Sequence, residues 1–139
     1  MEIKTYNNLD ARETGYFNFS TGKTVSSHDI WDVSFAHTTI SVKNTAQVIE
    51  AVFDELTVAP ESGFKADNDD KKAIPTGSGN GWYDYSFLRH SITPLAKKVI
   101  LVKTSDNQYV KVEIVSYYKD LHGESSFYTF RYAFIPLQV

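Results

Sequence analysis

Residues 109–118 read YVKVEIVSYY, and this stretch decides the fold class. Apolar side chains alternate in it with Lys111 and Glu113. An alternation of period two is typical of a β-strand that packs one face on the core. The pattern therefore predicts a long strand whose apolar side chains face inward, with Lys111 and Glu113 on the other face.

Two further strands are expected beside this one. Residues 99–102 read VILV, a continuous apolar run that predicts a strand buried on both faces. Residues 127–134 carry an aromatic side chain at every second position from Tyr128 to Phe134. Short polar turns at 105–108 and 121–125 join the three strands. Together they predict an antiparallel meander.

The N-terminal half shows shorter strand patterns. Residues 15–19 form an aromatic strand, and residues 31–35 alternate, which places His37 in phase with the apolar positions. Ile40 and Val42 lie on the opposite phase. Such a slip predicts a bulge or a sharp bend between Phe35 and Ile40.

Other segments are less regular. Residues 47–56 place apolar side chains at helical spacing and predict one short helix. Residues 57–81 form a long connection, which in a small domain is often functional. Residues 82–87 predict another strand. We therefore expect an all-β fold, a single antiparallel sheet or sandwich-like domain over residues 1–139, with a loose N-terminal segment at 1–14 and at most one short helix.

Composition narrows the classes of function. The chain has 139 residues, no cysteine and a net charge of −3. These features exclude disulfides and cysteine-based metal sites and argue against nucleic-acid or anionic-membrane binding. No apolar run is long enough to span a bilayer, and Met1-Glu2-Ile3-Lys4 does not resemble a secretory signal. If the protein is exported, we expect its signal or lipid anchor to lie outside these residues.

No catalytic arrangement is evident in the sequence. The glycine-rich run at 77–81 lacks the Lys-Ser/Thr of a phosphate-binding loop and the spacing of a nucleophile elbow. The aspartates at 67–70 lack the pattern of an EF-hand and are better explained as a solvated loop. We therefore expect a binding protein and not an enzyme.

An ordered set of segments resembles the HmuY-like family. The set runs from residue 15 to residue 134 and comprises Tyr16-Phe17, Thr21-Gly22-Lys23, residues 31–35, 74–83, 90–94, 99–104, 111–118 and 128–130. This resemblance implies an all-β protein, secreted or lipid-anchored on the outer surface of Gram-negative bacteria. It implies a hemophore-like role, in which heme is taken from a host carrier and passed to an outer-membrane receptor.

The resemblance also implies heme iron held by two axial side chains, two His or two Met. This sequence departs from that pattern. The family's best-known members carry an extra hairpin with one axial ligand, where the corresponding stretch here, residues 65–80, is short and contains no His or Met. Met1 is the only methionine, which excludes a pair of Met ligands.

Among the four histidines, His90 is the first candidate for an axial ligand to heme iron. It follows a stretch that contains Trp82, Tyr83, Tyr85 and Phe87, expected to line a groove, and Arg89, able to meet a propionate. The alternative is a loop histidine that hydrogen-bonds a carbonyl group.

His37 is the second candidate, with a hydrogen-bonded core or groove histidine as the alternative. His28 and His122 lie in polar turns and are expected at the surface.

The sequence thus favours a heme- or porphyrin-binding protein of the bacterial surface with heme as its cofactor. Because one chain offers one clear axial ligand, a homodimer around heme is a natural hypothesis. The alternative is a non-enzymatic surface binding or interaction module that keeps the scaffold and has lost the heme ligands.

Overall fold

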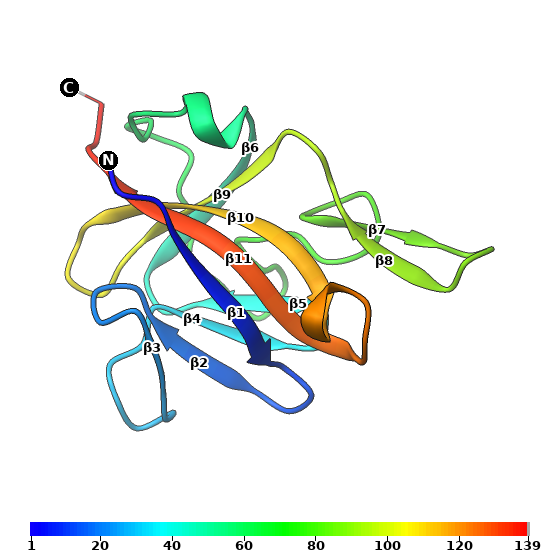
Figure 1. The fold of residues 1–139 in the computed structure, drawn as a ribbon. Coiled ribbons are helices and arrows are strands. Elements are labelled where there is room, and N and C mark those ends of the chain that lie inside the picture. Colours follow the sequence, from blue (N-terminus) through cyan, green and yellow to red (C-terminus); the bar gives the residue numbers. More distant parts are fainter. Residues whose placement is uncertain (139) are drawn as a thin grey trace.

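The computed structural model describes residues 1–138 and shows two packed antiparallel sheets with a projecting hairpin (Figure 1). In spatial order, the first sheet contains β1 (Lys4–Asp10), β11 (Ser125–Ile135), β10 (Tyr109–Tyr118), β9 (Lys98–Lys103) and β6 (Thr45–Glu50). The second contains β3 (Lys23–Val25), β2 (Gly15–Asn18), β4 (Val33–Ala36) and β5 (Thr39–Val42). The hairpin pairs β7 (Tyr83–Ser86) with β8 (Ser91–Pro94). The expected all-β, sandwich-like class is confirmed.

The core lies between the two sheets and is rich in aromatic rings. Phe130 of β11 contacts Phe17 of β2 with ring centroids 5.2 Å apart, and Phe35 of β4 with centroids 5.4 Å apart. All three side chains are buried. The alternation at 127–134 therefore turns its aromatic face toward the second sheet, as a half-buried strand requires.

The opposite face of the first sheet is covered as well, which corrects one expectation. Lys111 is 0% exposed, because the 3-10 helix η1 (Phe53–Glu55) and the residues after it lie over β10. The Lys111 ammonium donates to the carbonyls of Phe53 and Leu56, the latter at 2.9 Å, and lies 4.3 Å from the Phe53 ring centroid. Removal from water lowers the pKa of Lys111.

Two segments differ from their expected structure. Residues 47–56 form most of β6 and then η1, so the helical spacing arose from a strand followed by a tight turn. Residues 4–10 form β1, which pairs with β11, so the N-terminal segment is not loose. Besides η1, the described residues contain one other helical element, the 3-10 helix η2 (Lys119–Leu121).

The phase slip after residue 35 is a two-residue hairpin turn. Ala36 pairs with Thr39, so His37 and Thr38 form the turn and Phe35 faces the same side as its partner Ile40. The long connection at 57–81 is held by backbone bridges from Lys65 to Ala46 and from Ala59 to the C-terminal segment. Among residues 1–138, no helix is long and apolar enough to cross a membrane.

The burial of three tyrosines predicts that the protein loses stability at alkaline pH. Burial raises the pKa of Tyr117, Tyr128 and Tyr132, because it disfavours the phenolate, and for Tyr128 the rise is large. Their contribution to stability is therefore complete below the unfolded pKa of about 10 and is lost as the pH rises above it. Ultraviolet titration should show that these three tyrosines do not ionise near pH ~10 but only as the protein unfolds. A single transition near that pH for all tyrosines of the native protein would contradict this.

Candidate functional site

The β7–β8 hairpin projects from the body of the protein and carries most of the residues singled out in the sequence (Figure 1). Two hydrogen bonds fix it, one across its base and one to β10. The Leu95 amide donates to the Trp82 carbonyl at 2.8 Å, and the Ile92 amide donates to the Tyr118 hydroxyl at 2.7 Å. The hairpin is thus a separate two-stranded arm held at one end by the first sheet.

Trp82 and Tyr83 belong to the core, which corrects the expectation that they line an open groove. Trp82 is 3% exposed, its indole N–H donates to the Thr38 carbonyl at 3.0 Å, and its ring lies 5.3 Å from that of Tyr128. Tyr83 is buried beside it. Both residues precede the point at which the arm leaves the body, and for that reason their side chains pack inward.

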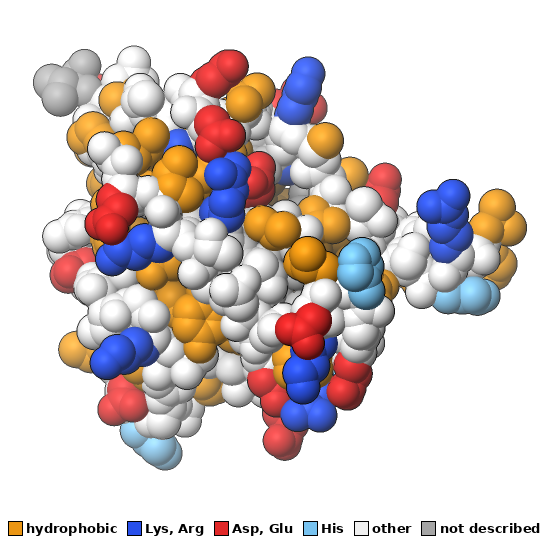
Figure 2. Space-filling view, in the orientation of Figure 1, with side chains coloured by type: hydrophobic (Ala, Val, Ile, Leu, Met, Phe, Trp, Pro, Cys, Tyr) orange, Lys and Arg blue, Asp and Glu red, His pale blue; other side chains and the backbone are white. Residues whose placement is uncertain are grey.

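The far end of the arm is exposed and apolar. Phe87 is 80% exposed and Leu88 is 93% exposed, while Tyr85 and Arg89 also reach solvent. Figure 2 shows apolar, basic and histidine side chains gathered at this end. Leu88 was not singled out from the sequence, because only the projection of the arm makes its exposure evident.

His90 closes the turn at the end of the arm. Its φ of 50° is in the left-handed region, so it reverses the chain before β8. Its ring Nδ1 lies 3.0 Å from the Tyr85 hydroxyl, and its ring centroid is 6.1 Å from that of Phe87. No hydrogen bond to Nε2 is found among residues 1–138, and the residue is exposed.

His37 is held in a different place, at the β4–β5 turn. Its Nδ1 lies 3.0 Å from the Ser126 hydroxyl, its carbonyl accepts a 2.5 Å hydrogen bond from Tyr128, and its amide donates to the Ala11 carbonyl. These contacts suit a histidine that ties the turn to β11. His28 and His122 are exposed, as expected from their turns.

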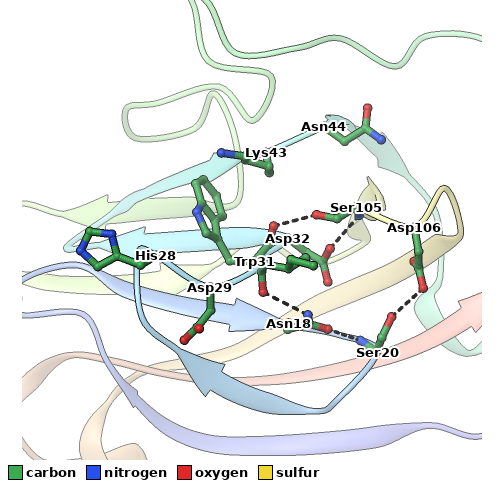
Figure 3. A pocket seen from close by; sticks show the side chains of 11 residues that line it. Asn18, Ser20, His28, Asp29, Trp31, Asp32, Lys43, Asn44, Ser105 and Asp106 are labelled. Carbon is green, nitrogen blue, oxygen red and sulfur yellow. Dashed lines mark hydrogen bonds between the residues drawn. The ribbon is translucent and has the colours of Figure 1, made fainter.

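A second concave site, not foreseen from the sequence, surrounds Trp31 (Figure 3). The cavity has a volume of about 690 Å³ and is formed where four turns meet. Its lining residues are Asn18, Ser20, His28, Asp29, Ile30, Trp31, Asp32, Lys43, Asn44, Ser105 and Asp106. Trp31 was expected within a strand, but β4 begins only at Val33, which leaves the indole at the cavity wall.

Asp32 fixes the floor of this cavity. Its side chain is 2% exposed, and one carboxylate oxygen accepts the Phe19 amide at 2.7 Å while the other accepts the Ser105 amide at 2.8 Å. One buried carboxylate thereby joins the second sheet to the β9–β10 turn. Its two charge-assisted hydrogen bonds satisfy backbone donors that the turns leave free.

Two exposed carboxylates at the rim are stabilised in their ionised form. The Thr104 hydroxyl donates to Asp106 and lowers the pKa of that carboxyl group. The Ser26 amide and hydroxyl donate to Asp29 and lower its pKa in the same way. The rim therefore stays negatively charged at neutral pH.

No protein-family model matches this sequence, and no curated protein matches it. Solved structures do match over nearly the whole chain. An apo HmuY analog from Tannerella forsythia is 19% identical, with a TM-score of 0.70 over 97% of this chain and 95% of that one.

Two structures from Bacteroides give similar results. A proposed HmuY-like heme-binding protein from Bacteroides vulgatus is 19% identical, with a TM-score of 0.65 over 94% of this chain and 89% of that one. A proposed lipoprotein from Bacteroides fragilis is 18% identical, with a TM-score of 0.64 over 94% and 86% of the two chains. At these identities the likeness establishes the fold.

Proposed function

We propose that this protein, which has an HmuY-like fold, binds heme or a related porphyrin at the exposed end of the β7–β8 hairpin, where His90 lies. The observation that carries the proposal is the state of His90. Its Nδ1 is held by the Tyr85 hydroxyl, and its Nε2 is free to act as an axial ligand to heme iron. Restraint of the second ring nitrogen is the usual way in which a protein orients a ligating imidazole.

The neighbouring side chains suit a porphyrin. Phe87 and Leu88 offer exposed apolar surface for the macrocycle, and Arg89 offers a cation for a propionate. Trp82 and Tyr83 support the arm from the core instead of lining the site. A bound heme would supply the iron, and the chain's own residues would hold and orient it without catalysing a reaction.

The site on one chain is open, which favours binding between two chains. A cleft of about 380 Å³ on the hairpin includes Tyr85 but not His90 or Phe87. His37, the other candidate ligand, is engaged with Ser126. A second copy that contributes its own His90 would complete both the ligand pair and the apolar walls. Sedimentation should then show a dimer at stoichiometric heme and a monomer without it, and a monomer under both conditions would argue against this arrangement.

The location that fits this role is outside the cytoplasm, at the outer-membrane surface or in the medium. The likeness to a proposed Bacteroides lipoprotein supports it. The partners would be a host heme carrier, from which heme is taken, and an outer-membrane receptor, to which it passes.

Titration with ferric heme tests the proposal. A saturable, shifted Soret band is expected in the wild type, and His90→Ala should weaken binding tenfold or more, because the axial ligand is lost. Tyr85→Phe should weaken it less, because only the restraint on Nδ1 is removed. His28→Ala, an exposed histidine in another turn, is the matched control and should bind as the wild type does.

The second candidate function is an interaction module that uses the same arm without heme. The strong exposure of Phe87 and Leu88 favours it, since large apolar side chains at a projecting tip are typical of a contact surface. Absence of any saturable Soret shift in the wild type would support this function over heme binding.

A further inference from the structure

We propose that the cavity around Trp31 is a binding site for a neutral saccharide, separate from the hairpin arm. Four turns from both sheets form its walls, and they place an aromatic ring beside polar groups of both hydrogen-bonding types (Figure 3). Ligand sites commonly combine such a concave surface with a few fixed polar groups.

The aromatic platform is held in place before any ligand arrives. The Ser105 hydroxyl donates to the Trp31 carbonyl at 2.8 Å, and the Asn18 side-chain amide donates to the Ile30 carbonyl at 3.1 Å. The Tyr16 ring packs edge-on to the indole, with centroids 5.2 Å apart. These contacts restrain the backbone and the indole ring, so little ordering remains for binding to bring about.

The polar groups suit hydroxyls. The Lys43 ammonium lies 5.2 Å from the Trp31 ring centroid and is exposed, so a pyranose stacked on the indole would move it to the rim, where it can donate. The side-chain oxygen of Asn44 and one carboxylate oxygen of Asp29 have no hydrogen-bond partner among residues 1–138. Both can accept a hydrogen bond from a ligand. A sugar hydroxyl both donates and accepts, and the C–H face of the ring packs on an aromatic surface.

Charge separates this ligand class from others. Three carboxylates line the cavity against one ammonium, so phosphates, nucleotides and acidic sugars would be repelled. A purely apolar ligand would remove water from the rim carboxylates and offer no hydrogen bonds in its place. A neutral sugar avoids both penalties.

The two tryptophans make a direct test possible. Trp82 is buried in the core and Trp31 is at the cavity, so a ligand here should move one indole N–H resonance and leave the other in place. The probes are cellohexaose, maltohexaose, mannohexaose and chitotetraose, with trigalacturonate as the acidic comparison. We expect at least one neutral probe to bind saturably, with a Kd of about 0.1–1 mM, and trigalacturonate not to bind.

Variants of Trp31 test whether the saccharide binds in this cavity. Calorimetric titration, which needs no Trp31 resonance, should show that Trp31→Ala weakens binding of that probe tenfold or more. Trp31→Phe, which keeps a smaller ring, should weaken it less and serves if the alanine variant is unstable. Phe87→Ala removes an exposed aromatic ring from the hairpin arm and is the matched control, with binding unchanged. The proposal is overturned if no neutral probe shifts the Trp31 resonance at ~10 mM, if trigalacturonate alone binds, or if binding survives in both Trp31 variants. Heme titration is independent of each of these results.

Discussion

Replacing Phe130 with alanine should lower the free energy of unfolding by about 3–5 kcal/mol. Phe130 is 0% exposed and lies at the centre of the contact between the sheets, against Phe17, Phe35 and Tyr6. The substitution removes the ring from an apolar environment and leaves a cavity that neighbouring rings, each fixed on its own strand, cannot fill. Urea denaturation followed by near-ultraviolet circular dichroism would measure the loss.

Val115→Ala is a suitable control for this experiment. Val115 lies on the neighbouring strand β10 but is substantially exposed, so its truncation should cost well under ~1 kcal/mol. A loss below ~1.5 kcal/mol for Phe130→Ala would show that the rings repack, and the tight packing of the core would then have to be reconsidered.

Replacing Asp32 with alanine should lower the free energy of unfolding by about 2–4 kcal/mol. The Phe19 and Ser105 amides both donate to this buried carboxylate, and alanine leaves them without an acceptor. Asp32→Asn keeps one acceptor oxygen and brings an NH₂ group against the other amide, so it should also destabilise the protein, but by less. Thermal or urea unfolding of both variants would show whether Asp32→Ala is the less stable of the two.

The Asp32 variants also have a local readout. The Ser105 amide resonance should move in both variants, because its acceptor is altered, and amide exchange in the β9–β10 turn should become faster. Asp70→Ala is the control, since Asp70 lies in an exposed loop and its side chain makes no hydrogen bond among residues 1–138. Equal stability of Asp32→Ala and Asp70→Ala would refute the assigned role.

The meander was predictable because its information is local. Residues 109–118 alternate with period two and become β10 with the same bounds, and the turns at 105–108 and 121–125 are polar and short. Residues 99–102 are apolar throughout because both faces of β9 are covered. In the meander, β9 pairs with β10 and β10 with β11, so these paired strands also follow one another along the chain, and there the sequence and the fold agree.

The failures concern contacts between distant segments. The alternation of residues 109–118 places Lys111 on the outward face of the strand. It is buried only because residues 53–56 return over β10. β1 was missed because it is a polar edge strand whose alternation is broken by a register shift between Tyr6 and Leu9. The Trp31 cavity was missed for the same reason, since four turns far apart in the chain form it.

For the hairpin arm, the sequence identified the residues but not their directions. Tyr83 and Tyr85 share one phase of the strand pattern, yet the first is buried and the second is exposed. The pattern contains no information about where a strand leaves the body of the protein. The role of His90 as a ligand stays a prediction for the heme titration.

The pairing of β1 with β11 constrains the order in which the chain can fold. Asn8 donates its amide to the Thr129 hydroxyl across 121 positions of sequence, and the rest of β1 depends on the same distant partner. Contacts of such separation form late and slowly, because a long loop must close before they contribute. While the chain is being synthesised, residues 4–10 have no strand to join until residues 125–135 have left the ribosome. β1 is thus made long before its partner β11, and the first sheet stays incomplete until β11 is available.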